Sequence, residues 1–351
     1  MNYKKALVIN LGGIGDLVIS TAFFRNFKSS FPECHVTALI SKRGAELVEG
    51  LHYIDEVIAY DLQDANLKDL LFSPRKFLKS ILFLLKLRKK RYDISVNLLP
   101  LTSLQSAIKM AAVFFMLGAK IRGGRDTEGL GWFYQIKVKE PLSFEKYDVE
   151  LQGELLEKIG GKFIDNSLDL PIPPEDELFI EKQLLKNGIK SGRALIVVNP
   201  GSNWPSRRWP VENFIETVKG LKSKTDASFI VTGSASEIPL AEMIQKGAGD
   251  VLVLVGKTTL HQLAALLKHS SLFITNDTGP MHLAIAIGVP VVTIFGPGHY
   301  KRFFPPDREG IVRKEFKCSP CVKKECDDMG CLKAITPEEV IEKALWLLSR
   351  K

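Results

Sequence analysis

The chain contains the stretch Thr275-Asn276-Asp277-Thr278-Gly279-Pro280-Met281-His282-Leu283 between two short apolar runs. The run before it, 272–274, predicts a buried strand, and the run after it, 289–295, predicts a second one. Residues 283–288 predict a helix that ends at a glycine cap. The polar stretch is therefore a turn from a strand into a helix, which indicates the α/β class.

This turn suits a phosphate ligand. Asp277 and Thr278 are good N-cap residues, and Gly279 lets a ligand approach the backbone closely. The N–H groups and the dipole at the start of a helix favour an anion. A capped helix without a ligand is the alternative, because such turns occur throughout α/β folds. His282 is either a donor-site residue or a structural hydrogen-bonding residue.

Alternating strands and helices extend over the whole chain and restart once. Strands are predicted at 5–11, 36–40, 57–60, 92–98 and 120–123, and again at 194–199, 228–232, 251–254, 272–275 and 289–295. Helices are predicted at 17–29, 43–49, 103–117, 174–187, 211–223, 238–245, 259–268 and 336–349. The Pro-rich segment 170–174 predicts a linker. We expect two Rossmann-like, doubly wound domains, 1–170 and 171–335, with ligands in the cleft between them.

Length and composition indicate a soluble globular protein. The chain has 351 residues, of which 45% are apolar and 25% are charged. No apolar run reaches the roughly 18 residues of a membrane span. No secretory signal precedes the first predicted strand, so a cytoplasmic location is expected.

The net charge of +8 is concentrated in one segment. Residues 75–91 hold eight basic residues and no acid, with apolar residues at helical spacing between them. A basic amphipathic helix suits an anionic membrane surface, here the inner membrane. The alternative is a core-facing helix with a solvated basic end. Nucleic acid is not an expected partner, because no RNA- or DNA-binding motif accompanies the charge.

The turn after the first strand, Gly12-Gly13-Ile14-Gly15-Asp16, offers a carboxylate between glycines. It lacks the full Gly-x-Gly-x-x-Gly spacing of a dinucleotide site, and Asp16 would place negative charge against a phosphate. Asp16 is a candidate general base, with Gly13 and Gly15 letting an acceptor come close. The alternative is that Asp16 only caps the helix.

The loop 199–210 follows a buried strand and carries two arginines. Ser202 and Asn203 offer small hydrogen-bonding groups, and Arg207 and Arg208 could clamp a pyrophosphate. The alternative is a surface loop with both guanidinium groups in water. The cleft motifs contain no Asp-x-Asp pair, so cationic side chains and a helix N-terminus are expected to neutralise a diphosphate, without a catalytic metal.

Four of the five cysteines lie within fourteen residues, at Cys318, Cys321, Cys326 and Cys331. Four thiolates fit a tetrahedral structural site, with zinc expected and iron as the alternative metal. Free thiols or disulfides are the alternatives.

Taken together, these motifs resemble glycosyltransferase family 9, the ADP-heptose–lipopolysaccharide heptosyltransferases and their relatives. The resemblance runs through nearly the whole chain, in the family's order. It rests on Gly15-Asp16, the loop Pro200–Pro210, the Gly-x-Thr-x-Leu element Gly256–Leu260, the turn Asn276–His282 and the following Phe295-Gly296-Pro297.

The resemblance implies a GT-B fold with the nucleotide-sugar in the second domain and the acceptor against the first. It implies inversion at the anomeric carbon without a metal, with Asp16 as the general base. Arg207 stands where heptosyltransferases usually have lysine, which keeps the charge and changes the geometry. In such folds the last helix, 336–351, can cross back to the first domain. The implied donor-binding residues are Ser202, Asn203, Arg207, Arg208, Gly256, Thr258, Asp277, Thr278, Gly279 and His282.

The implied function is transfer of a heptose from ADP-heptose, an ADP-sugar, to a lipopolysaccharide core or another lipid-linked glycan. Transfer from another nucleotide-sugar, or to a protein, is an alternative within the same fold. A nucleotide-sugar epimerase has the same architecture and needs no acceptor. A non-catalytic scaffold or nucleic-acid binder, using the basic segment and the cysteines, is the rival outside enzymes.

Overall fold

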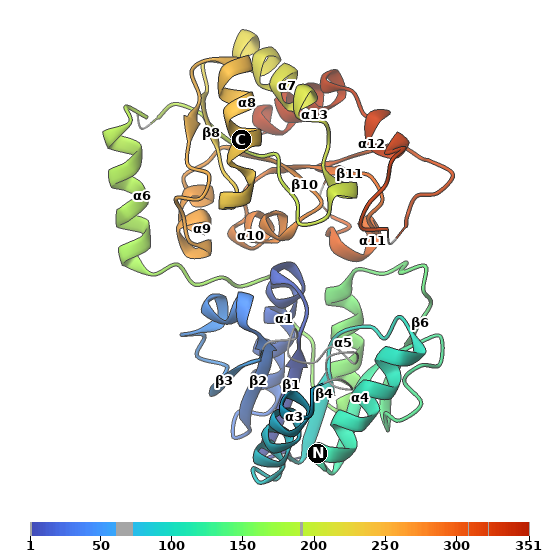
Figure 1. Ribbon diagram of the computed structural model, residues 1–351. Coiled ribbons are helices and arrows are strands. Elements are labelled where there is room, and N and C mark those ends of the chain that lie inside the picture. Colours follow the sequence, from blue (N-terminus) through green and yellow to red (C-terminus); the bar gives the residue numbers. More distant parts are fainter. Residues whose placement is uncertain (1, 61–72, 190–191, 308, 322, 351) are drawn as a thin grey trace. The chain divides into compact units, whose positions relative to one another are not determined.

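The computed structural model describes residues 2–60, 73–189, 192–307, 309–321 and 323–350. Contacts divide the chain into two units, Met1–Asp169 and Leu170–Lys351 (Figure 1). The division lies at the Pro-rich segment.

The first unit is a six-stranded parallel sheet in the order β3-β2-β1-β4-β5-β6. Its strands are β1 (Lys5–Asn10), β2 (His35–Ser41), β3 (Glu56–Tyr60), β4 (Ile94–Asn97), β5 (Ile121–Thr127) and β6 (Ile136–Glu140). Its helices are α1 (Ile14–Ser30), the 3₁₀ helix η1 (Lys42–Val48), α3 (Pro74–Arg88), α4 (Leu104–Leu117) and α5 (Asp148–Ile159).

Side chains alternate along β1 between two cores. Ala6 and Val8 belong to the core that contains residues of α1 and α5. Leu7 and Ile9 belong to the core that contains residues of α3 and α4. Since successive residues of a strand point to opposite faces, the two pairs of helices cover the two faces of the sheet (Figure 1). Burial on both faces explains why the strands are apolar runs.

The second unit has the same topology, with strand order β12-β11-β10-β7-β8-β9 and parallel pairing throughout. Its strands are β7 (Leu195–Asn199), β8 (Ser228–Val231), β9 (Leu252–Val253), β10 (Leu272–Asn276), β11 (Val291–Phe295) and β12 (Ile311–Arg313). Its helices are α6 (Pro174–Lys186), η3 (Pro205–Arg207), α7 (Val211–Lys224), η4 (Ala235–Glu237), α8 (Ile238–Ala248), α9 (Leu260–Lys268), α10 (Gly279–Ile287), α11 (Tyr300–Phe303), α12 (Gly330–Lys333) and α13 (Pro337–Ser349).

Several predicted boundaries change. The helix expected at 43–49 is a 3₁₀ helix, and the first helix begins at Ile14, three residues before the expected start. The strands β6 and β12 and the helix α5 were not predicted. β6 and β12 are edge strands, each paired to one neighbour only, and short edge strands carry a weak apolar signal.

The last helix packs in its own unit. α13 lies on α7 and on β10, β11 and β12. Its buried residues Val340, Ile341 and Ala344 join the core that contains Trp209. The apolar stripe of α13 is therefore buried within the second unit, and the crossing back to the first unit stays a prediction. Among the described residues, no helix is both long and apolar enough to span a bilayer.

Candidate functional site

Three of the predicted motifs lie where a sheet reverses its strand order. In the first sheet the reversal falls between β1 and β4, and in the second between β7 and β10. Loops that leave two such neighbouring strands diverge, and the crevice at the carboxyl ends of the strands is where open α/β sheets bind ligands. The turn to Asp16 follows β1, the arginine loop follows β7, and the turn at Asp277 follows β10.

Asp16 lies in the first turn of α1, where its carboxylate accepts the Gly13 N–H at 2.9 Å. The buried side chain of Asn10, the last residue of β1, makes hydrogen bonds to the backbone of the same turn. Its amide donates to the Asp16 carbonyl at 2.9 Å and its carbonyl oxygen accepts the Gly12 N–H at 3.1 Å. A Cβ at Gly12 would overlap the Asp16 side chain, so glycine is needed there. The turn is thus built to hold the carboxylate in one place.

This geometry confirms the capping contact and also keeps Asp16 half-buried at the edge of the sheet. The predicted neighbours differ in exposure: Gly13 is exposed and Gly15 is buried. Capping and proton transfer are compatible, because a carboxylate has two oxygens and several acceptor positions.

In the second unit the structure brings Arg207 and Asp277 together from two different loops. The Arg207 Nη1 lies 2.9 Å from the Asp277 Oδ2, and the two side chains are 18% and 3% exposed. The guanidinium also lies over the Trp204 ring, 4.4 Å from its centroid. Asp277 therefore does not act as a simple helix cap. Instead it fixes the arginine beside the start of α10.

Asn276 joins the same two loops through the backbone. Its amide donates to the carbonyls of Pro200 and Gly201, and its Oδ1 accepts the Trp209 N–H at 3.1 Å. The side chain is fully buried. A single residue at the end of β10 thus sets the course of the arginine loop at both of its ends.

Glu237 is a site-edge residue that the sequence analysis missed. Its carboxylate is buried, and it accepts the Ser234 N–H at 2.7 Å. A Cβ at Gly201 would overlap this carboxylate, so the Pro200-Gly201 turn rests directly on it. The sequence signal was a Ser-x-x-Glu capping box, which predicts a helix start and gives no hint of the neighbouring loop.

The remaining predicted donor residues lie around this edge. Arg208 uses its Nε to bind the Ser202 carbonyl at 2.7 Å, and it thereby closes its own loop. Ser202 is buried and Asn203 is exposed. Thr278 is the N-cap of α10 by position, without a capping hydrogen bond from its side chain, and Gly279 begins the helix.

Two other donor predictions are placed as follows. Gly256 donates its N–H to the Gly233 carbonyl and its Cα faces Ala235, so it joins the loop after β8. Thr258 is half-buried, and the next residue, Thr259, caps α9. His282 is 4% exposed, with its ring 6.0 Å from that of Phe303.

The cysteine segment is attached to the arginine loop. Ser206 donates its N–H to the Lys324 carbonyl and its hydroxyl to the Lys323 carbonyl, at 3.1 and 2.6 Å. Burial, followed by the charges of the other three cysteines, raises the pKa of Cys331. No three of these described thiols come within 4.8 Å of one another, so the predicted tetrahedron is not preformed. The thiols fit a soft metal by chemistry but not by position.

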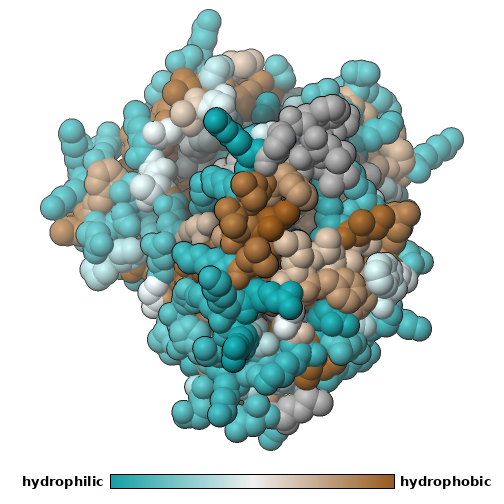
Figure 2. Space-filling view, turned by 60° about the horizontal axis from the view of Figure 1, so that its bottom comes forward, coloured by the Kyte–Doolittle hydropathy of each residue, from teal (hydrophilic) through white to brown (hydrophobic). Residues whose placement is uncertain are grey.

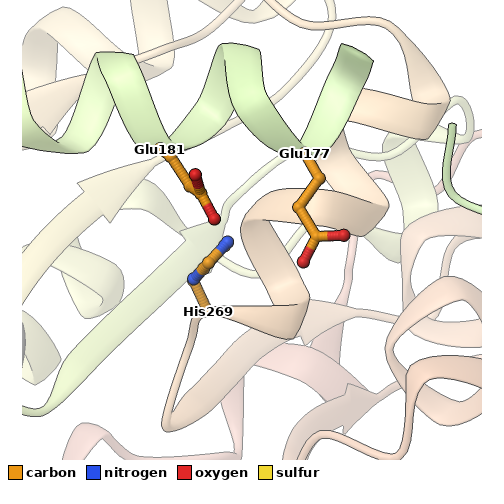
Figure 3. Close-up of side chains that lie close together, drawn as sticks. All are labelled: Glu177, Glu181 and His269. Atoms are coloured by element: carbon orange, nitrogen blue, oxygen red, sulfur yellow. The ribbon is translucent and has the colours of Figure 1, made fainter. Parts of the chain in front are cut away.

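One other group among the described residues has the composition of a cation site. Glu177 and Glu181 of α6 and His269 after α9 bring their polar atoms within 4.8 Å (Figure 3). Glu177 is already paired with Lys268 at 2.7 Å, and the group lies apart from every predicted motif. The arrangement stabilises the contact between α6 and α9.

These features define a class of protein. Two parallel sheets of identical strand order, with a carboxylate at the reversal of one and an arginine beside a helix N-terminus at the reversal of the other, form a GT-B fold. The sequence pattern of the family "Glycosyltransferase family 9 (heptosyltransferase)" matches residues 83–331, which is more than half of the chain. The chain belongs to this family and is a glycosyltransferase.

Relatives of known name agree with this assignment. The chain is 29% identical to lipooligosaccharide heptosyltransferase 2 of Campylobacter jejuni, over 61% of the chain and 69% of the relative. It is 27% identical to lipopolysaccharide heptosyltransferase 2 of Salmonella typhimurium, over 99% of both.

Solved structures share the fold. A family 9 glycosyltransferase of Veillonella parvula has a TM-score of 0.78 at 22% identity, and the match covers 100% of the chain and 98% of the relative. The E. coli heptosyltransferase WaaC with ADP has a TM-score of 0.71 at 19% identity, covering 98% and 99%.

Proposed function

We propose that this glycosyltransferase moves a heptose from ADP-heptose to a sugar of a lipopolysaccharide core, with inversion and without a catalytic metal. The observation that carries the proposal is the Arg207–Asp277 pair at the start of α10, in a chain of a heptosyltransferase family. Support for the donor comes from the related heptosyltransferase solved with ADP. Support for the acceptor comes from the lipopolysaccharide heptosyltransferases among the relatives.

The second unit would bind the donor. The start of α10 at Thr278 and Gly279 offers N–H groups and a positive dipole end to the diphosphate. Arg207 is held beside it, and its paired carboxylate orients the guanidinium. Because the pair is close to neutral, the dipole and the second arginine, Arg208, must supply most of the remaining positive potential.

The first unit would bind the acceptor and hold the base. An acceptor hydroxyl gives its proton to Asp16 as its oxygen attacks C1 of the heptose. The C1–O bond to the diphosphate breaks, and the electron pair leaves with ADP. Attack from the face opposite the leaving group inverts the anomeric centre. General-base assistance of this kind typically contributes about 10²–10⁴ in rate.

Acceptor-dependent release of ADP tests the proposal. Purified chain, ADP-heptose and a soluble truncated core acceptor should release ADP, and omission of the acceptor should stop the release. NMR of the product should show an inverted anomeric configuration. Product formation only with another nucleotide-sugar or a protein acceptor would replace the donor or acceptor in the proposal.

An epimerase is the second candidate, because the chain also shares its fold with a putative UDP-N-acetylglucosamine 2-epimerase of Listeria monocytogenes, at a TM-score of 0.56. The likeness extends to the fold alone. Conversion of a nucleotide-sugar in the absence of any acceptor would favour this candidate.

We further propose a cytoplasmic location at the inner membrane, where the lipid-linked acceptor is made. We also propose that the cysteine segment closes on one zinc or iron ion with a structural role, drawing its four thiols together.

A further inference from the structure

Helices α3 and α4 lie side by side on one face of the first sheet. Arg88, at the end of α3, donates to the Met116 carbonyl of α4 at 3.4 Å. Leu87 of α3 and Ala107 and Phe114 of α4 fill the core beneath them. Their inner faces are therefore already used in packing.

Their outer faces are also apolar. The alternative given above for residues 75–91, a helix that packs its apolar side on the core, does not predict this. Seven of the fifteen exposed large hydrophobic residues in the described chain lie on these two helices. They are Phe77, Leu78, Leu82 and Leu85 of α3, at 42–57% exposure, and Leu104, Ile108 and Phe115 of α4, at 52–64%. We call this surface the α3–α4 face. Figure 2, which turns this end of the molecule toward the viewer, shows brown residues gathered and bordered by teal ones.

Spacing along each helix arranges these residues in stripes. Leu78, Leu82 and Leu85 are four and three residues apart, so they share one side of α3. Leu104 and Ile108 are four apart and share one side of α4 in the same way. On α3, Arg75 and Lys86 project just beside the leucine stripe, eleven residues, or about three turns, apart.

The charge of this face has one sign. Residues 75–91 and 104–122 contain eleven lysines and arginines and no aspartate or glutamate. Lys90 is paired with Glu56 and Lys120 with Asp93, and Lys76 and Lys79 also have partners. Arg75, Lys86 and Lys89 are exposed.

We propose that the α3–α4 face docks on an anionic phospholipid bilayer and inserts its apolar side chains below the headgroups. Transfer of the exposed leucine and phenylalanine side chains from water into lipid is favourable in free energy, and the flanking cations reach lipid phosphates. A second copy of the chain is a poorer occupant, because two faces of the same positive charge would repel each other. The inference is independent of which sugar is transferred.

A natural reporter lies next to this face. The Arg122 guanidinium covers the Phe115 ring at 5.0 Å, and its Nε donates to the Phe133 carbonyl at 3.0 Å. Trp132, the residue before Phe133, is 58% exposed and is the one tryptophan of the first unit. Tryptophan favours the membrane interface.

The test uses the full chain with vesicles of phosphatidylcholine, with and without phosphatidylglycerol, at low salt. The chain should sediment with the mixed vesicles and much less with pure phosphatidylcholine. Trp132 emission should shift to the blue, and Trp132→Phe should lose that shift.

Two sets of substitutions separate insertion from charge. Leu82→Gln with Ile108→Gln should weaken binding about tenfold or more, because two buried apolar contacts are lost. Arg75→Gln, Lys86→Gln and Lys89→Gln together should weaken it roughly 100-fold, about fivefold for each cation. The controls lie at exposed positions of α6: Leu178→Gln with Leu185→Gln matches the apolar pair, and Lys182→Gln with Lys186→Gln removes two charges where the tested set removes three. These should bind as the wild type does.

Turnover of a soluble acceptor should stay unchanged in all of these variants, which separates this inference from the proposed function. Equal binding to both kinds of vesicle, or full binding by the Leu82/Ile108 variant, would overturn it. So would a dimer in size exclusion that the Leu82/Ile108 variant dissociates, without vesicle binding by the wild type, because the occupant would then be a second copy.

Discussion

The two units have the same strand order, yet their turns are stabilised over very different distances along the chain. In each unit, the two strands at the reversal end in a buried asparagine: Asn10 and Asn97 in the first, Asn199 and Asn276 in the second. Asn10 and Asn97 bind backbone groups of the turn that follows them, within six residues, and Asn97 also donates to the Tyr134 hydroxyl at 3.0 Å. Asn276 binds the arginine loop, about seventy residues away.

This difference separates a local device from a tertiary one. The turn of Asp16 is held mainly by contacts within residues 10–20, and the Ser41 hydroxyl adds one bond from β2 to the Gly12 carbonyl at 2.9 Å. The turn of Asp277 is complete only when β7 and β10 pair, because Arg207 and Asn276 meet their partners across that pairing. The same fold thus places the proposed base, Asp16, by mainly local contacts and needs the pairing of β7 and β10 to place the Arg207 cation.

The largest effect is expected from a substitution at Asp16 that removes the proposed base and keeps the hydrogen bond of its turn. Asp16→Asn should keep an acceptor for the Gly13 N–H and lose the base, so turnover should fall about 10²–10⁴-fold with donor affinity nearly intact. Steady-state ADP release and calorimetry with ADP measure the two quantities. Asp16→Ala serves as a control, since it also loses the acceptor of the Gly13 N–H and should cost about 1 kcal/mol of stability. Near-normal turnover of Asp16→Asn would leave Asp16 as a cap only.

The next largest effect is expected when the cation beside the Asp277 turn, Arg207, is removed. Arg207→Ala should lower turnover on the order of 10²-fold and weaken ADP binding, because the Asp277 carboxylate beside the diphosphate would lose the cation that offsets it. The variant also leaves Asp277 without this partner in a buried place, so its melting temperature should fall. Arg207→Lys restores the charge without the fork and should recover part of the rate. If both rate and affinity were unchanged in Arg207→Ala, the diphosphate would have to bind elsewhere.

The comparison of asparagines can be tested directly. Asn276→Ala leaves the Trp209 N–H and the carbonyls of Pro200 and Gly201 without this partner, each costing about 1–3 kcal/mol if it stays buried. Denaturant unfolding should show the loss, and ADP affinity should fall with it because Arg207 is displaced. Asn97→Ala should lower stability without weakening ADP binding. Equal effects on ADP from both variants would contradict the distinction between local and tertiary turns.

The smallest effect on rate is expected at the cysteine segment. Cys321→Ser should reduce metal content and lower the melting temperature, while ADP binding remains measurable because Ser206 still holds the arginine loop to Lys323 and Lys324. Elemental analysis of protein purified without added metal gives the wild-type content. Near-zero zinc and iron, with four titratable native thiols, would exclude the site.

The sequence predicted those features of the fold that depend on residues close together along the chain. The helices α4, α7 and α9 and most inner strands followed from apolar periodicity, which is a property of neighbouring residues. Strands β6 and β12 did not, because charged residues interrupt the few apolar residues that each contains. The motifs around Asp16, Arg207 and Asp277 were found from their residue types, since small polar residues after an apolar strand are informative by themselves.

Contacts between distant segments could not be predicted in the same way. Glu237 was hidden because its capping box gives no sign of Gly201, whose backbone touches it only in the folded sheet. The apolar residues of α3 fitted either a core or a membrane surface by spacing alone, and only packing against α4 and the sheet showed which were left outside.

The sequence by itself determined the alternation of strands and helices, the break near residue 170, the polar turns and the uneven charge. All of these depend on short-range order along the chain: periodicity, caps and composition. The tertiary structure decided which turns share an edge, that Asp277 binds Arg207, that α13 packs on α7 and the second sheet, and which apolar side chains remain exposed. These depend on the pairing of strands far apart in sequence, and that pairing is set by burial of the whole sheet.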